Sequence, residues 1–247
     1  MNEPKPGVMI LGGRSDIGLA AAHAFARAGH PVMLAAREAQ SLAADCQDIS
    51  LRYGAGAQAV EFDVLASSAL PEFAGAGEAP PGIVVCVVGL MGDQRESELD
   101  PAAAARVMRS NFEGPALILG LYAERMAALG RGTIVGVSSV AGDRGRASNY
   151  VYGAAKAGFT AFLSGLRNRL ARQGVQVITV KPGFVATRMT EGLDLPRALT
   201  AAPEEVAEAI LHAVERGRDV VYVRPVWRMI MAIIRILPER LFKKTSL

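Results

Sequence analysis

The sequence has few of the residues that build disulfide frameworks and metal sites. It contains only two cysteines, Cys46 and Cys86, which stand alone without a CxxC spacing, and its three histidines are scattered. Secreted disulfide scaffolds and zinc sites need closely spaced ligands of these types. We therefore expect no metal site and a protein of a reduced, cytoplasmic compartment.

Long hydrophobic runs are also missing. The first apolar run, residues 8–11, is too short for the core of a signal peptide. No apolar stretch reaches the roughly 20 residues that cross a bilayer as a helix, although residues 226–237 come about halfway. The lack of long hydrophobic runs supports the same cytoplasmic assignment.

Outside the C-terminal end, the chain has no large excess of positive or negative charge. The whole chain has a formal net charge of +3, and residues 224–247 carry six basic side chains against Glu239, a net +5. Residues 1–223 therefore carry −2, which does not favour nucleic acid as a partner of the main body. The six basic residues are Arg224, Arg228, Arg235, Arg240, Lys243 and Lys244.

Apolar residues are abundant, at 51% of the chain, and their spacing alternates between two periods. Short, continuously apolar runs are typical of parallel strands that are buried on both faces, and helical spacing fills the gaps. This order predicts a doubly wound parallel α/β sheet in residues 1–223, followed by an amphipathic helical tail in 224–247. The predicted strands are 7–12, 31–36, 57–62, 82–88, 132–138, 175–181 and 219–223. The predicted helices are 17–28, 38–53, 101–129 (capped by Asp100), 149–172 and 203–216, and 184–202 is predicted to be a mobile loop or lid.

A glycine-rich turn follows the first predicted strand and leads directly into a helix. It reads Gly12-Gly13-Arg14-Ser15-Asp16-Ile17-Gly18. Such a turn lets the backbone approach a pyrophosphate, whose charge the positive end of the helix stabilises. Glycine turns also serve simply to reverse a chain, but the place of this one after the first strand predicts dinucleotide binding.

The ends of the next two predicted strands indicate which dinucleotide binds. A carboxylate after the second strand would bind the ribose of NAD, whereas this sequence has Ala36 and then Arg37. Together with Arg14, Arg37 favours the 2′-phosphate of NADP, although Arg37 could also be a solvated loop charge. After the third strand, Asp63 and Val64 are placed to contact adenine, and an ordinary turn aspartate would look the same.

Three further residues form a pattern typical of proton transfer. Tyr152 and Lys156 are four residues apart on a predicted helix, so that the ammonium lies beside the phenol. A neighbouring cation favours the phenolate and brings tyrosine closer to use as a proton shuttle. Ser139, at the end of the fifth strand, could steady a substrate oxygen. Each residue alone has an ordinary structural explanation, but the three together do not.

These motifs together resemble the short-chain dehydrogenase/reductase family over residues 7–223. The resemblance implies a Rossmann fold with strand order 3-2-1-4-5-6-7 and a homodimer or homotetramer. It also implies that Ser139 orients the substrate oxygen, that Tyr152 is the general acid/base, that Lys156 holds the nicotinamide ribose and lowers the pKa of Tyr152, and that Asn111 supports a proton-relay water. The cofactor-binding residues that it implies are Gly12, Arg14, Ser15, Asp16, Ile17, Gly18, Arg37, Asp63, Val64, Gly89, Tyr152, Lys156, Pro182, Gly183, Val185 and Thr187.

The sequence departs from the family pattern at a few positions. Leu11 replaces a threonine, Asp16 replaces the middle glycine of the turn, and Cys86-Val87-Val88-Gly89 replaces Asn-Asn-Ala-Gly. Asp16 is a plausible N-cap, and its charge near a pyrophosphate would need to be offset by Arg14. Residues 88–93 and 138–159 and the tail most resemble the subset that contains the reductase of decaprenylphosphoryl-2-keto-pentose, which hints at the substrate.

The tail has two interpretations. Residues 226–237 contain ten apolar positions of twelve, with Arg228 and Arg235 on one helical face. Such a helix can lie on an anionic membrane through residues 226–244, with Trp227 at headgroup level. It can equally form an oligomer contact or cover the substrate cleft.

The sequence therefore predicts an NADP(H)-dependent oxidoreductase that interconverts a secondary alcohol and a ketone. The apolar tail suggests a lipophilic or lipid-linked substrate and a peripheral position at the inner membrane face. The alternative is a catalytically idle NADPH-binding sensor or scaffold that docks on a membrane or a partner. The ordered set of Asn111, Ser139, Tyr152 and Lys156 argues against that alternative.

Overall fold

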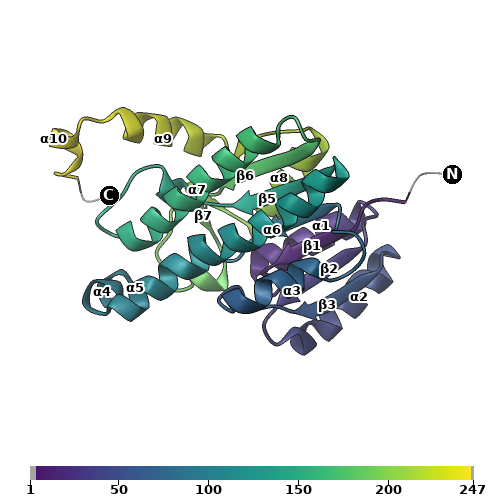
Figure 1. Cartoon of the computed structure of the whole chain (residues 1–247). Helices are drawn as coiled ribbons and strands as arrows, with labels where there is room; N and C mark the ends of the chain where they lie inside the picture. Colours follow the sequence, from purple (N-terminus) through teal and green to yellow (C-terminus); the bar gives the residue numbers. More distant parts are fainter. Residues whose placement is uncertain (1–3, 246–247) are drawn as a thin grey trace.

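A parallel seven-stranded sheet forms the centre of the molecule (Figure 1). The computed structural model describes residues 4–245, and the order of the strands is β3-β2-β1-β4-β5-β6-β9. The strands are β1 (Val8–Leu11), β2 (Val32–Ala36), β3 (Ala57–Glu61), β4 (Ile83–Cys86), β5 (Gly132–Val137), β6 (Val175–Lys181) and β9 (Val220–Tyr222). This order confirms the predicted doubly wound topology.

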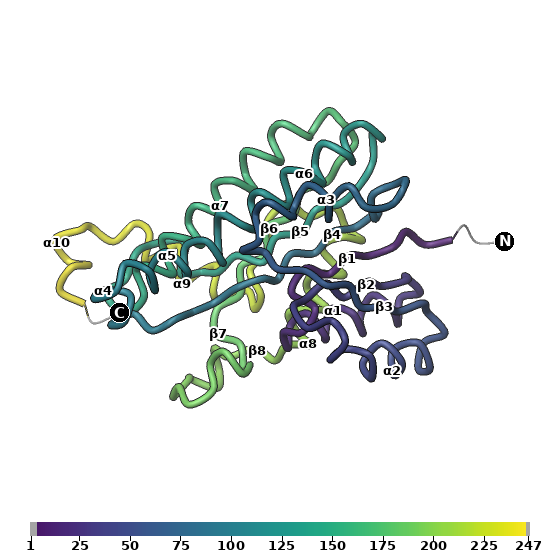
Figure 2. Tube along the Cα trace, turned by 60° about the horizontal axis from the view of Figure 1, so that its bottom comes forward, coloured from purple at the N-terminus to yellow at the C-terminus, as the bar shows by residue number. Residues whose placement is uncertain are grey.

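Helices cover both faces of the sheet because its central strands are apolar on both sides. Side chains that point to one face, such as Val8 and Ile10, pack in a core with α1, α2 and α8. Side chains that point to the other, such as Met9 and Leu11, pack with α3, α6 and α7. Figure 2 shows these two groups of helices on opposite sides of the strands.

The helices match the sequence-based assignment in most places. The helices are α1 (Asp16–Arg27), α2 (Ala43–Tyr53), α3 (Leu70–Gly75), α4 (Gln94–Leu99), α5 (Pro101–Met108), α6 (Gly114–Leu129), α7 (Tyr150–Leu170), α8 (Pro203–Glu215), α9 (Val226–Ile236) and α10 (Glu239–Phe242). The predicted N-cap at Asp100 is confirmed, because its carboxylate accepts a hydrogen bond from the amide of Ala102 at 2.8 Å.

Two predicted helices are interrupted, and two short helices were not predicted. The segment 38–53 begins with a separate 3₁₀ turn, Ala39–Leu42, and 101–129 contains a π-helical turn, Arg109–Glu113, between α5 and α6. α3 and α4 have six residues each, which is too short for a clear apolar period. The π-helical turn contains Asn111, and such turns are frequent at functional sites.

The segment predicted as a loop, 184–202, contains a second small sheet. β7 (Phe184–Val185) pairs in parallel with β8 (Thr200–Ala201). Strands of two residues leave no alternating pattern in the sequence, so the prediction of an irregular loop was incomplete.

The tail packs against the body of the protein, and the prediction that Trp227 lies at membrane headgroup level is wrong. Trp227 is 4% exposed, and its indole Nε1 donates a hydrogen bond to the carbonyl of Leu199 at 3.0 Å. Met231, one turn further along α9, is fully buried in the same cluster. Between residues 4 and 245, no helix is long and apolar enough to span a bilayer.

Arg144 fastens the end of the tail to the segment that follows β5. Its guanidinium donates to the carbonyl of Ile234 at 2.6 Å and to the carboxylate of Glu239 at 2.8 Å. It also lies 3.9 Å from the centre of the Phe242 ring, a cation–π contact. The tail therefore packs along one side of the molecule through contacts at both of its ends.

Candidate active site

A cleft lies at the carboxyl ends of the strands, where open α/β sheets bind ligands. Its larger part is a cavity of about 490 Å³, which is within the usual size of ligand sites. A smaller cavity of about 140 Å³ continues from it, and four residues line both parts: Ile17, Val87, Gly89 and Met189.

The glycine turn forms one wall of the larger cavity. Gly12 has a φ of +93°, which favours glycine, and a Cβ at this position would lie 3.0 Å from the amide nitrogen of Val88. Ser15, rather than Asp16, is the N-cap of α1, because its hydroxyl accepts from the amide of Gly18 at 3.0 Å. Gly18 does not line the cavity. A Cβ there would lie 2.4 Å from the carbonyl oxygen of Gly12, so Gly18 permits the tight turn.

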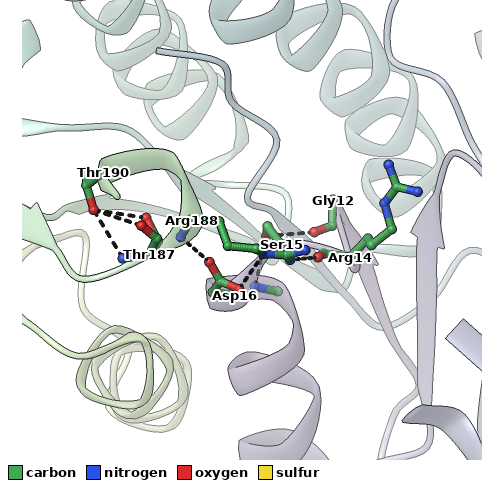
Figure 3. A network of polar contacts seen from close by, with 8 residues as sticks. Gly12, Arg14, Ser15, Asp16, Thr187, Arg188 and Thr190 are labelled. Carbon is green, nitrogen blue, oxygen red and sulfur yellow. Dashed lines mark hydrogen bonds and ion pairs between the residues drawn. The ribbon is translucent and has the colours of Figure 1, made fainter. Parts of the chain in front are cut away.

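Arg188 neutralises Asp16, and Arg14 does not, contrary to the prediction. The Asp16 carboxylate accepts from the Arg188 backbone amide at 2.8 Å and from its guanidinium Nε at 2.9 Å. The Arg14 side chain instead pairs with Glu38 and points away from Asp16 (Figure 3). The ion pair between Asp16 and Arg188 joins the start of α1 to the segment after β7, across the edge of the cleft.

Basic residues outnumber acidic residues on the walls of the larger cavity. Asp16 and Asp63 are its two carboxylates, and Asp63 is partly engaged because it accepts from the amide of Leu65 at 3.0 Å. The four basic residues are Arg14, Arg37, Arg106 and Arg188. The surplus of positive charge fits a ligand that carries several phosphates. The other predicted cofactor residues on these walls are Gly12, Ser15, Ile17, Val64, Gly89 and Thr187.

The smaller cavity brings together Ser139, Tyr152 and Lys156, which come from the end of β5 and from α7. The Ser139 hydroxyl accepts from the amide of Ala141 at 3.1 Å. The Lys156 ammonium donates to the carbonyl of Val137 at 3.0 Å and lies 5.8 Å from the centre of the Tyr152 ring. These contacts hold the three side chains in fixed positions at the inner end of the cleft.

Burial controls the protonation of this site. It raises the pKa of the Tyr152 phenol to about 12, and a hydrogen bond with Ser139 lowers that pKa only in part. Burial lowers the pKa of the Lys156 ammonium to about 8, against a smaller opposing effect of Cys86. The resemblance implied that Lys156 lowers the pKa of Tyr152, but burial dominates in this structure and the net shift is upward. Tyr152 is a neutral phenol at neutral pH and can donate a proton.

Asn111 lies behind the cavity wall and not on it. Its amide nitrogen donates to the carbonyl of Val107 at 2.8 Å, and its Oδ1 accepts from the amide of Leu90 at 3.2 Å. A Cβ at Gly89 would lie 3.1 Å from Asn111 Oδ1 and 3.6 Å from Lys156 Nζ. Asn111 therefore fixes the segment around Gly89, close to Lys156.

The segment after β6 forms the other wall of the smaller cavity. Pro182, Gly183 and Val185, for which the resemblance implies a role in cofactor binding, line it. The indole of Trp227 packs directly on Gly183, where a Cβ would lie 1.9 Å from the ring. Gly183 therefore lets the tail approach the site, so that Trp227 becomes part of the wall.

Several wall residues were missed by sequence reasoning. Arg188 directly follows Thr187 of the recognised motif, and Arg146 and Asn149 lie between Ser139 and Tyr152, so their neighbours in sequence were available as a signal. Trp227 reaches the cavity only through the packing of α9. The missed residues include Arg106, Arg188 and Met189 in the larger cavity, and Met91, Arg146, Asn149, Phe184 and Trp227 in the smaller one.

The fold and the cleft define the class of the protein before any comparison is made. A doubly wound parallel sheet with a glycine turn after β1 and a cleft at the strand ends is a dinucleotide-binding α/β fold. The sequence pattern of the family described as short chain dehydrogenase matches residues 7–197. The chain therefore belongs to the short chain dehydrogenase family, and it is an oxidoreductase.

Two relatives in sequence support the same assignment, and a solved structure shows the same fold. An uncharacterized oxidoreductase of Mycobacterium tuberculosis is 40% identical over 243 residues, which cover 96% of each chain. An uncharacterized oxidoreductase of Streptomyces coelicolor is 36% identical over 98% of this chain and 96% of its own. A solved short chain dehydrogenase of Burkholderia cenocepacia, in complex with NADP, has a TM-score of 0.82 at 23% identity and covers 99% of this chain and 98% of its own.

Proposed function

We propose that the protein is an NADP(H)-dependent reductase of ketones, which also runs in reverse on secondary alcohols. The observation that carries this proposal is a protonated phenol, Tyr152, beside Ser139 at the inner end of a cleft that begins at the glycine turn. A buried acid next to a hydroxyl donor is suited to a substrate oxygen on which negative charge develops.

Each side chain of the site has a separate role in the proposed reduction of a ketone. When bound, the nicotinamide supplies or accepts the hydride. Ser139 donates a hydrogen bond to the substrate oxygen and orients it. Tyr152 gives its proton to that oxygen as the alcohol forms. Lys156 binds the ribose hydroxyls of the cofactor and lies beside the ring of Tyr152. Asn111 holds the backbone segment around Gly89 in place.

The cofactor proposal is based on the arginines of the larger cavity. Arg37 follows β2, where a carboxylate would favour NAD, and Arg14 lines the same cavity. The Burkholderia protein of the same fold binds NADP. We expect Arg37→Ala to weaken NADPH binding by about ten- to a hundredfold and NADH binding much less. Paired titrations of the two cofactors measure this, and equal affinities in the parent protein would exclude the NADP preference.

We also propose that the substrate is lipophilic, in line with the resemblance to the decaprenylphosphoryl-2-keto-pentose reductase subset. Apolar side chains form much of the wall of the smaller cavity: Met91, Val140, Phe184, Met189 and Trp227. A screen of NADPH oxidation against keto-sugars, keto-lipids and steroid ketones tests the substrate class. The same screen tests the alternative of a catalytically idle scaffold, because a scaffold would reduce none of these ketones. Membership of the family does not favour that alternative.

The outer face of the tail supports a proposal of peripheral contact with an anionic membrane, from the cytoplasmic side. Met229, Ile233 and Ile236 on α9 are exposed, as are the basic side chains Arg228 and Arg235. Exposed apolar residues of this size beside a net positive charge favour an anionic interface. We further propose that the protein forms a homodimer or homotetramer. Met108 on α5 and Leu117 on α6 are exposed apolar side chains outside the tail, and they offer a surface for this assembly.

A further inference from the structure

The smaller cavity has a polar corner that no part of the proton-transfer machinery uses. This corner is formed by Arg146 and Asn149, from the segment between β5 and α7, which line the same cavity as Ser139 and Tyr152. Arg146 Nε and Asn149 Oδ1 are both buried, and neither has a hydrogen-bond partner among the residues that the structure describes. Buried polar atoms without partners are rare and costly, so each requires an explanation.

The corner combines one positive charge and one hydrogen-bond acceptor. Burial lowers the pKa of Arg146, and the carboxylate of Asp143 opposes this effect. Both oxygens of that carboxylate already have partners, since Asp143 pairs with Lys181 and accepts from the hydroxyl of Tyr222 at 2.7 Å. The walls of the cavity contain no carboxylate. The guanidinium therefore has no counter-ion within the cavity.

The other walls of the cavity leave room for a ligand to supply the missing partners. Met91, Val140, Phe184 and Trp227 line the same cavity and offer no carboxylate or amide side chain to either atom. Trp227 uses its indole NH for the carbonyl of Leu199. A molecule that fills this cavity to reach Tyr152 would therefore also meet Arg146 and Asn149.

We propose that Arg146 and Asn149 recognise an oxyanion group and an adjacent hydrogen-bond donor on the ketone substrate. This inference rests on the proposed ketone reduction and adds a substrate class to it: ketones that carry a carboxylate or a phosphate-type group and a hydroxyl. Arg146 Nε donates to the oxyanion, and Asn149 Oδ1 accepts from the hydroxyl. A charge-assisted hydrogen bond of this kind is worth about ten- to a hundredfold in affinity.

The experiment compares ketones that differ only in charge. The pairs are 4-oxopentanoate with its methyl ester, and 2-oxopropylphosphonate with its dimethyl ester. Binding is read from the fluorescence of Trp227, the single tryptophan of the chain, which lines the same cavity. The kcat/KM for NADPH oxidation is measured in parallel. The measured quantity is the ratio between the two members of each pair, so a general loss of binding does not imitate the effect.

The parent protein should prefer the anionic member of at least one pair by about tenfold or more, and which pair does so distinguishes a carboxylate from a phosphate-type group. Arg146→Gln should bring the ratio close to one, and Arg146→Lys should restore part of it. Asn149→Asp should also abolish the preference, because it places a carboxylate in the corner. Arg172→Gln, which removes an exposed charge at the opposite end of the sheet, should leave the ratio unchanged.

The inference is overturned if neither anionic ketone binds more tightly than its ester, or if the preference survives in Arg146→Gln. Either result leaves the proposed reductase activity standing, provided that any ketone is reduced. Conversely, if no ketone is reduced but Trp227 still reports a preference that depends on Arg146, the proposed reaction fails and the recognition site stands.

Discussion

At the scale of single residues, burial decides the protonation of the site. Tyr152 and Lys156 are one helical turn apart on α7, yet the ammonium lies by the ring of the tyrosine and donates to the carbonyl of Val137. The pKa of the phenol is raised and that of the ammonium is lowered, because both charged forms lose solvation. A phenol that stays protonated favours donation of a proton to a ketone at neutral pH, whereas the reverse reaction should require alkaline conditions.

The first prediction concerns the proton donor. Tyr152→Phe removes the hydroxyl and keeps the ring, so we expect turnover to fall by about 10²- to 10⁴-fold while the affinity for NADPH changes little. Single-turnover kinetics with a ketone from the screen and a separate NADPH titration measure the two quantities. Near-normal turnover in this variant would show that another group donates the proton.

The second prediction concerns the stability cost of Lys156. Its pKa is lowered from 10.5 to about 8, so the unfolded chain binds more protons than the folded protein between these values. The free energy of unfolding therefore contains a penalty at neutral pH that is relieved as the pH rises through this window. We expect Lys156→Met to be more stable than the parent by about 1–3 kcal/mol at neutral pH.

This advantage should shrink as the pH approaches 10.5, because the parent then loses the buried charge. Urea unfolding of both proteins across the window tests the expectation. An advantage that does not depend on pH would point to better packing of methionine instead. The same variant should lose turnover and cofactor affinity together, since Lys156 serves both.

At the scale of elements, contacts between distant segments close the cleft. Asp16 at the start of α1 binds Arg188 after β7, and Arg144 after β5 binds the end of α9. The first contact joins the cofactor turn to the segment that contains Thr187, and the second joins the tail to the segment that contains Arg146. On each side of the cleft, one arginine therefore makes several contacts to a distant segment: Arg188 to the start of α1, and Arg144 to the end of the tail.

The third prediction tests the first of these contacts. Asp16→Ala removes the acceptor of the Arg188 amide, so hydrogen exchange of the peptide around residues 184–193 should become several-fold faster. The melting temperature should change little, because an exposed ion pair contributes about 0–1 kcal/mol. Asp48→Ala, which breaks the exposed pair with Arg52 on α2, is the matched control. Unchanged exchange in Asp16→Ala would show that the segment is held by other contacts.

At the scale of the whole molecule, the tail has two different faces. Trp227 and Met231 are buried against the body, and Trp227 lines the smaller cavity, whereas Met229, Ile233 and Ile236 point to solvent. In Figures 1 and 2 the tail lies at the same end of the molecule as α4 and α5. One helix can therefore shape the substrate cavity and still present an apolar, basic surface outward.

The fourth prediction concerns this outer surface. The full chain should co-sediment with anionic vesicles, less so at high salt, and replacing Met229, Ile233 and Ile236 together by serine should release it without loss of the fold. Three exposed leucines elsewhere, Leu51, Leu99 and Leu129, provide the control when replaced in the same way. If the parent stays in the supernatant and the tail variant instead changes the oligomeric state, the tail surface is an assembly contact.

Local residue patterns were enough to predict most of the strands and helices, the glycine turn after β1 and the pairing of Tyr152 with Lys156, whereas the order of the strands in the sheet followed from the family resemblance. The patterns depend on residues that are close in the chain, and strand and helix periods can be read within a few residues of sequence. The interruption of the helix at Arg109–Glu113 and the two-residue strands β7 and β8 were not predictable, because each is too short to repeat a helix or strand period.

The surroundings of the site residues depend on tertiary packing. The partner of Asp16 is 172 residues away in the chain, and no local spacing indicates it. Trp227 lines the smaller cavity because Gly183 leaves room for its ring, although an amphipathic helix of the same sequence could lie on a membrane. The pKa values of Tyr152 and Lys156 moved away from each other for the same reason: burial depends on what packs around a side chain in three dimensions, and residue spacing does not encode it.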